Sequence, residues 1–153
     1  MIRQAKVDDI ESINKLLYQV HDVHANIRPD LFVKGKKKYN NNELISIIND
    51  CLRPIFVYEE NNIILGYAFC IFEEEHLPSM QNIKTLYIDD LCVDKEARGK
   101  HIGSKLYEYV KKYAKENSCY NITLNVWEGN NNAYEFYKKI GLKVQKTKLE
   151  EIL

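Results

Sequence analysis

One stretch, residues 85 to 116, restricts the folds open to this chain more than any other. It begins with an apolar run of strand length, Thr85–Val93, which two adjacent carboxylates interrupt. A loop with two glycines, Arg98–Ser104, then leads into Gly103–Glu116, whose apolar residues share one helix face. Those residues are Leu106, Val110, Tyr113 and Ala114. A buried strand that enters a helix through such a loop is typical of α/β domains.

The other apolar segments supply further strands and helices. Strands are predicted at Ile2–Lys6, Pro54–Tyr58, Ile63–Phe72, Ile122–Val126 and Leu142–Leu149, with a hairpin loop at Glu59–Asn62. Helices are predicted after Asp8 or Asp9, which would cap the first one, and at Glu43–Cys51 and Asn132–Ile140. Hairpins come first, and strands alternate with helices later. This order predicts an α/β (mixed α+β) sheet with a parallel portion near the C-terminus.

Composition excludes several classes of protein. The 153 residues suffice for one domain with a full-sized core, so residues 1–153 are interpreted as a single domain. Hydrophobic residues make up 45% and charged residues 29%, which excludes a disordered chain. Because 22 Lys and Arg balance 22 Asp and Glu, nucleic acid is not an expected partner. We find no long apolar run and no signal-peptide core, and we expect a cytoplasmic protein without membrane contact.

The four cysteines do not form a recognisable metal site. Cys51, Cys70, Cys92 and Cys119 include no CxxC pair, and their spacing to histidines matches no zinc pattern. We therefore expect reduced cysteines and no metal. Two disulfides remain an alternative.

The loop Arg98–Ser104 is a candidate anion site. The first turn of a helix has unpaired amide donors and the positive end of the helix dipole, and glycines allow close approach to a phosphate. Arg98 and Lys100 add positive charge, and Ser104 adds a hydroxyl. The loop matches neither the Walker motif nor the dinucleotide GxGxxG motif. A plain strand-to-helix connection with solvated charges is the alternative.

The carboxylates Asp89 and Asp90 are unusual within an apolar strand. Adjacent strand residues face opposite sides of a sheet, so in a sheet covered on both faces at least one carboxylate would enter a buried or cleft environment. Loss of water there would raise its pKa unless a partner compensates. The alternative is an exposed strand end where both are solvated.

A third segment, Asn130–Leu142, combines a loop of three asparagines with an amphipathic helix. Ala133, Phe136, Tyr137 and Ile140 fall on one helix face. Periodicity alone favours Tyr137 as a core aromatic residue with its hydroxyl at the edge. Gly141 would end the helix.

Together these three segments resemble the GNAT superfamily of N-acetyltransferases. Arg98–Gly103 matches the cofactor motif Q/R-x-x-G-x-G/A of that superfamily, and Asn130–Tyr137 matches its N-x-x-A-x-x-F-Y segment. Gly141 and Leu142 match the Gly-Phe step that follows. The resemblance covers nearly the whole chain. It implies a mostly antiparallel sheet with a parallel pair near the C-terminus and helices on both sides.

The resemblance also implies acetyl-CoA as cosubstrate and a role for each motif position. The pantetheine arm would pair with the backbone of Leu91, Cys92 and Val93. The pyrophosphate would be held by the amides of Arg98, Gly99, Lys100, His101, Ile102, Gly103 and Ser104. Asn130 would contact the cofactor near the arm, and Tyr137 would protonate the departing thiolate. The amine would attack the thioester directly, with no covalent enzyme intermediate.

Two positions depart from the family pattern. His101 stands where the motif has its middle glycine, and either points away from the phosphate or donates to it. Asn125 stands where the N-terminal acetyltransferases of ribosomal proteins carry a glutamate. Spermidine/spermine acetyltransferases instead have an acidic pair, which Asp89 and Asp90 match. We therefore predict Asp89 as general base, directly or through water, and Asp90 as an acceptor contact, with Glu128 as another candidate base.

The acceptor is expected to be a primary amine on a small molecule or peptide. With a pKa near ~10 such an amine is mostly protonated at neutral pH, so a base is needed. The segment His21–Phe32 lies where the superfamily lines its acceptor pocket, and Arg28 is predicted as a substrate contact. A protein N-terminus or lysine is an alternative acceptor, and a non-catalytic acyl-CoA-binding regulator is an alternative function. A homodimer is left open.

Overall fold

The computed structural model describes all 153 residues as a mixed α/β domain. The strands are β1 (Ile2–Gln4), β2 (Ile55–Glu60), β3 (Ile63–Glu74), β4 (Lys84–Val93) and β5 (Asn121–Leu124). The helices are α1 (Ile10–Ile27), α2 (Asn41–Ile48), α3 (Ile102–Glu116) and α4 (Asn131–Lys139). Short 3-10 turns cover Val7–Asp9 and Lys95–Ala97. None of the helices combines the length and the hydrophobicity that crossing a membrane requires.

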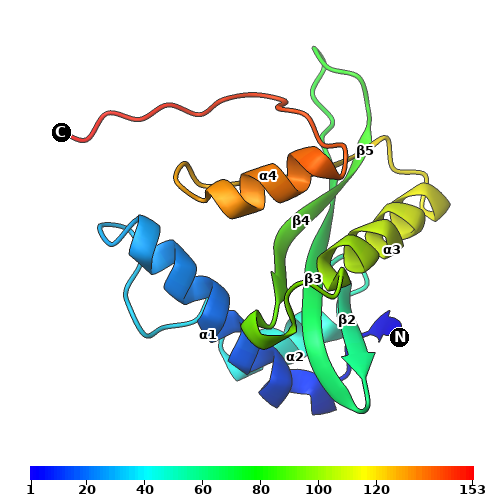
Figure 1. Ribbon diagram of the computed structural model, residues 1–153. Coiled ribbons are helices and arrows are strands. Elements are labelled where there is room, and N and C mark those ends of the chain that lie inside the picture. The colour runs from blue at the N-terminus through cyan, green and yellow to red at the C-terminus, as the bar shows by residue number, and fades with distance from the viewer.

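The strands form one sheet in the order β1-β2-β3-β4-β5 (Figure 1). The pairs from β1 to β4 are antiparallel, and β4 pairs with β5 in parallel, which confirms the predicted fold class. The β2–β3 hairpin turns through Asn61 and Asn62, whose φ angles are 51° and 63°. Two consecutive residues with positive φ make the tight turn that matches strand twist, and asparagine tolerates this conformation well.

Apolar helix faces cover the sheet on both sides. On one side, α1 and α2 contribute Ile13, Leu16, Leu17, Leu44 and Ile47 to a buried cluster. On the other side, α3 contributes Tyr107, Val110 and Ala114 to a second cluster. The 3.6-residue periodicity read from the sequence is therefore the periodicity with which these helices bury their side chains. The predicted cap of α1 is wrong in detail, since the Asp9 carboxylate accepts from Arg3 and from the Lys6 amide.

Strand β4 changes the face that it buries partway along. Phe69 pairs with Asp90, whereas its neighbour Cys70 pairs with Ile88, so Asp89 is an extra residue, a β-bulge. Before the bulge, Ile88 packs into the cluster beneath α3. Beyond it, Cys92 packs into the cluster beneath α1. One inserted residue shifts the two-residue alternation and reverses which side chains face each side.

Strands β4 and β5 part after four residues. Their pairing covers Thr85–Ile88 and Asn121–Leu124 only. Strand β4 continues to Val93 and bonds to β3 throughout, but its other edge has no strand partner beyond Ile88. Exposed strand edges offer backbone donors and acceptors to a ligand that can pair as a strand does. The sheet therefore has an opening, the gap between β4 and β5 beyond Ile88. It lies at the end of β4 that leads to the loop Arg98–Ser104.

The strand predicted at Leu142–Leu149 is wrong. Gly141 ends α4 with a φ of +107°, and residues 143–153 form an extended, exposed segment, here called the C-terminal arm. The arm runs along α4 and projects beyond it (Figure 1). Residues of high strand propensity form a strand only where a neighbouring strand accepts their backbone bonds, and the arm has none in this chain.

Candidate active site

The loop after β4 is held in place by α1. Asp94 is buried, and its carboxylate accepts from the Glu96 amide at 3.1 Å and from the Lys15 ammonium at 2.8 Å. Gln19 of α1 also accepts from the Lys95 amide at 3.0 Å. The Lys15 hydrogen bond is the main reason why the pKa of Asp94 lies below its usual range. These bonds attach the start of the loop to α1.

The loop ends at a helix N-terminus with free amides. Gly99 has a φ of +86° and His101 a φ of +58°, and His101 precedes α3 without a side-chain cap. Amides 99 to 104 donate to no group of the protein, and the first bond of α3 runs from the Lys105 amide to the His101 carbonyl. The His101 side chain is exposed. Unpaired amides at the positive end of a helix dipole bind anions, as the sequence predicts for this loop.

Gly103 has a second role that its motif position does not reveal. A Cβ atom added there would lie 3.2 Å from Cζ of Phe136 and 3.7 Å from Cγ2 of Val93. The first turn of α3 is thus packed so closely against α4 that any larger residue would require Phe136 to shift. Gly103 therefore couples the anion-binding loop to the helix that carries Tyr137.

The open edge of β4 consists of Leu91, Cys92 and Val93. The Cys92 thiol is buried and donates to the Leu16 carbonyl at 3.6 Å. Burial raises the pKa of this thiol to about 12. A thiol this difficult to ionise is unreactive, so this stretch of β4 offers a ligand its backbone and not its sulfur.

The two carboxylates of β4 do not face opposite sides of the sheet. The bulge turns both toward the side that α1 and α2 cover, which corrects the prediction from simple alternation. Asp89 accepts from the Lys38 ammonium at 2.7 Å and from the Tyr39 hydroxyl at 2.5 Å. Both donors belong to the segment between α1 and α2. Only 10% of the Asp89 side chain is exposed, so these two donors largely replace its water.

Asp90 has a different environment. Its carboxylate accepts one side-chain hydrogen bond, from the buried Tyr67 hydroxyl at 2.7 Å, and the backbone amide of Leu91 also lowers its pKa. Burial raises the pKa of Asp90 to about 6, and the charge of Asp89 adds to this effect. The bond from Tyr67 and the charge of Lys38 act in the opposite direction. A carboxylate that titrates near neutral pH and keeps a free oxygen is suited to accept a proton.

Tyr137 of α4 is close enough to Asp90 and Cys92 for their charges to act on it. Its ring packs edge-on against Phe136, with ring centroids 5.1 Å apart. Burial is the main cause that raises the pKa of Tyr137, and the charges of Asp90 and of the Cys92 thiol contribute. The Tyr137 hydroxyl bonds to no group of the protein and is not sealed from solvent. It is therefore a donor without a partner in the protein, within range of the charge of Asp90.

Three further candidate residues lie in the segment between β5 and α4. Asn130 caps α4, since its side-chain oxygen accepts from the Ala133 amide at 3.4 Å, and its side-chain amide is unengaged. Glu128 is exposed in the turn before α4 and forms no ion pair. Asn125 donates to the Tyr87 hydroxyl at 3.1 Å.

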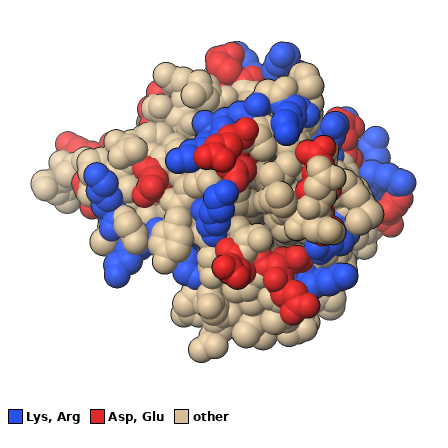
Figure 2. Space-filling model, turned by 60° about the horizontal axis from the view of Figure 1, so that its bottom comes forward, with Lys and Arg blue, Asp and Glu red and all other residues tan.

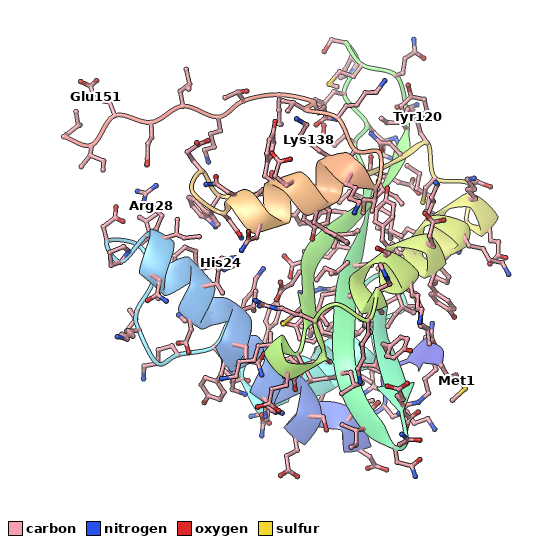
Figure 3. All side chains as sticks on the ribbon, viewed as in Figure 1. Met1, His24, Arg28, Tyr120, Lys138 and Glu151 are labelled. Carbon is pink, nitrogen blue, oxygen red and sulfur yellow. The ribbon has the colours of Figure 1, made fainter.

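The segment that ends α1 forms an aromatic cluster with the turn before α4. The Phe32 ring lies 5.3 Å from His24 and 5.5 Å from Trp127, centroid to centroid. Burial is the main cause that lowers the pKa of His24. Arg28 directly follows α1 (Figure 3) and pairs with both oxygens of Asp30. Its guanidinium carbon lies 5.6 Å from the centroid of the Trp127 ring. Its remaining donor group binds Glu150 of the arm, so in this conformation Arg28 organises the cluster and is not free for a ligand.

Figure 2 turns the bottom of the view in Figure 1 toward the reader. On this face, basic and acidic side chains are interspersed. No single sign dominates that face. This distribution matches the equal numbers of basic and acidic residues in the sequence.

Comparison with known proteins decides the family. A family model described as "Acetyltransferase (GNAT) family" matches residues 18–142, which is most of the chain and includes the loop Arg98–Ser104, both carboxylates and Tyr137. The chain belongs to the GNAT acetyltransferases. The predicted family is thus confirmed, and so is the prediction that the protein is an acetyl-transferring enzyme.

Several relatives and solved structures resemble this GNAT chain. A thialysine N-epsilon-acetyltransferase from Bos taurus is 27% identical over 151 residues, covering 92% of this chain and 82% of the relative. A mutant of the BH1408 protein from Bacillus halodurans is 33% identical with a TM-score of 0.95, covering 100% of this chain and 99% of that one. An aminoglycoside N-acetyltransferase in complex with CoA shares the fold, with a TM-score of 0.73, 12% identity, and 100% and 98% coverage.

Contacts in the fold link several of the predicted residues. Gly103 of the loop lies against Phe136 and Val93, and the charges of Asp90 and Cys92 act on Tyr137, whereas Glu128 is exposed in the turn before α4. Sequence reasoning missed Lys38, Tyr39 and Tyr67, which control the environment of the two carboxylates. No local signal distinguishes them, because a lysine in a basic run and two tyrosines in apolar surroundings are ordinary residues.

Proposed function

We propose that the protein transfers an acetyl group from acetyl-CoA to a primary amine by direct attack. The observation that carries this proposal is the juxtaposition of a base and an acid. Asp90, with a pKa of about 6, lies in the part of β4 that β5 does not pair with, and its charge acts on Tyr137, whose hydroxyl has no partner in the protein. One can accept a proton as the amine attacks, and the other can donate one as the thiolate departs.

The chain's residues fit acetyl-CoA as the donor. The amides of residues 99 to 104 would hold the pyrophosphate, with Arg98, Lys100 and Ser104 beside them. The backbone of Leu91–Val93 would pair with the amide groups of the pantetheine arm, because that edge has no strand partner. Asn130, with its free side-chain amide, would contact the same arm.

We assign the proton-accepting role to Asp90 rather than to Asp89. Both oxygens of Asp89 already accept hydrogen bonds, one from an ammonium group and one from a hydroxyl, so neither is available to take a proton from an amine. Asp90 has one neutral side-chain donor and a raised pKa. Asp89 is then the group that holds a cationic amine in place, and Asp90 accepts its proton directly or through water.

The acceptor that these contacts favour is a primary amine on a flexible aliphatic chain. An ammonium group already binds Asp89 at 2.7 Å, donated by the end of a lysine side chain. The bovine relative is named for thialysine, a lysine analogue, which supports the same class. Small molecules and peptides with such an amine are both compatible with this contact.

An amine panel with acetyl-CoA, read as release of free CoA thiol, tests the proposal. Lysine, thialysine, polyamines, aminoglycosides and a peptide with a free N-terminus span the acceptor classes. We expect turnover with at least one aliphatic primary amine and none with its N-acetylated form. CoA binding without turnover across the panel would contradict the proposal and favour a non-catalytic acyl-CoA-binding regulator.

A further inference from the structure

We propose that Lys38 occupies the position of the acceptor amine and is itself acetylated, so that the enzyme modifies its own α1–α2 segment. This inference rests on the proposed function. It adds a modification site that the transfer reaction alone does not require.

The first observation is the selective placement of one lysine among four. The run Lys34, Lys36, Lys37 and Lys38 reads as a solvated loop. Lys37 instead binds the side chains of Asn14 and Asn41, on the outer side of α1. Only Lys38 reaches a carboxylate of the active site, with its Nζ atom 2.7 Å from Oδ1 of Asp89.

The second observation is where this ammonium lies. Asp89 is the bulge residue at the point where β4 loses its parallel partner, and Asp90 follows it directly. The ammonium therefore lies next to both carboxylates of β4, and its positive charge lowers the pKa of Asp90. Tyr39 holds the other oxygen of Asp89 and stacks on Phe69, which anchors the backbone next to Lys38.

The chemistry is that of the proposed reaction with an internal acceptor. The Lys38 ammonium loses one proton to a carboxylate or water, and its nitrogen attacks the thioester carbonyl carbon. A C–N bond forms and the C–S bond breaks. The sulfur leaves as CoA thiol with a proton from Tyr137, and Tyr137 regains a proton from the nitrogen as the amide forms. The products are Nε-acetyl-Lys38, CoA and one released proton, so no further reactant is needed.

The modification would change the site in a defined direction. An acetylated lysine has no positive charge and cannot pair with Asp89. Asp89 would then be available to an external ammonium. Lys38 thus acts as an internal competitor of the acceptor until it is acetylated or displaced.

Peptide mapping by mass spectrometry after incubation with acetyl-CoA tests this inference. We expect acetylation at Lys38 at least about 10-fold faster than at Lys37, Lys36 or Lys34, at a rate per molecule that does not depend on protein concentration. Lys37 is the matched control, being adjacent and bound to neutral groups. Tyr137→Phe should slow the reaction at Lys38 and leave chemical acetylation of Lys36 unchanged.

The outcomes separate this inference from the proposed function. If an external amine is acetylated in the same sample while Lys38 reacts no faster than Lys37, the inference is overturned and the function stands. If neither an external amine nor Lys38 is acetylated, both are overturned. In Lys38→Arg, which keeps the cation, the mass shift at position 38 must disappear.

Discussion

At the residue scale, neighbouring carboxylates have different environments because they have different partners. Asp89 receives a cation and a phenol, whereas Asp90 receives one phenol and loses water. The sequence identified the acidic pair but not the division of labour within it. The insertion of Asp89 as a bulge opposite Phe69 and Cys70 depends on long-range strand pairing, which no local pattern encodes.

The raised pKa of Asp90 predicts a cost to stability. A carboxyl whose pKa is about 6 when folded and about 3.9 when unfolded binds protons more tightly in the folded state. Its contribution to stability therefore falls as pH rises from about 4 to about 6. Asp90→Asn keeps an acceptor for Tyr67 and removes the charge, so we expect it to stabilise the protein by about 1–3 kcal/mol at pH 7.5. Thermal unfolding at pH 4 and pH 7.5 checks this, and an equal effect at both pH values would contradict it.

The Tyr137 hydroxyl is predicted to act and not merely to pack. Tyr137→Phe keeps the ring against Phe136, so folding and CoA affinity should change little. Loss of the donor should lower kcat by about 100-fold or more if protonation of the thiolate limits the reaction. Steady-state kinetics with calorimetry of CoA binding on the same samples measures both. A variant that unfolds more easily while its folded fraction turns over normally would identify Tyr137 as a core residue.

At the element scale, the contact between α3 and α4 links the loop Arg98–Ser104 to the helix that carries Tyr137. An alanine at position 103 would gain up to about 1 kcal/mol in helix propensity, but its Cβ would press within 3.2 Å of Phe136. Overpacking of this kind typically costs about 1–3 kcal/mol, so we expect Gly103→Ala to be destabilising on balance. Its melting temperature and its CoA dissociation constant are the measurements. Phe136→Leu in the same chain should restore part of the lost stability. If it restores none, crowding against Phe136 is not the cause of the loss.

Element types were largely predictable from the sequence, and element partners were not. The helices α1, α3 and α4 follow their apolar periodicity closely, and β2 and β3 follow their branched and aromatic residues. The segment Leu142–Leu149 has the composition of a strand but no neighbour within its own chain. A segment forms a strand only when another strand pairs with it, and local propensity does not reveal whether such a partner exists.

At the scale of the whole molecule, the site depends on contacts between segments distant in sequence. Lys15 and Gln19 of α1 hold Asp94, Lys38 and Tyr39 hold Asp89, and Gly103 receives Phe136. Motifs located the loop, the acidic pair and Tyr137, because each is carried by a short local pattern. The residues that tune them come from other elements and became visible only in the folded chain.

A ligand that binds these elements together should stabilise the entire domain. Acetyl-CoA or CoA at about 100 times its dissociation constant should add roughly 2.7 kcal/mol to the free energy of unfolding. Thermal shift assays at near-millimolar ligand measure this effect. Gly103→Trp, which would push α4 from the loop, should abolish it. An equal shift in both proteins would contradict the assignment of the cofactor site.

The pH dependence of kcat/KM, compared between wild type and Asp90→Asn, tests the central claim most directly. With a primary amine that the panel identifies, the wild type should gain activity through an apparent pKa of about 6, because Asp90 accepts a proton only when ionised. Asp90→Asn should lack this limb, fall by about 100-fold at pH 7 and recover partly at high pH, where the amine is already free. Asp89→Asn, the matched control, should keep the limb and mainly raise KM for a cationic acceptor. An unchanged profile in Asp90→Asn would contradict the account.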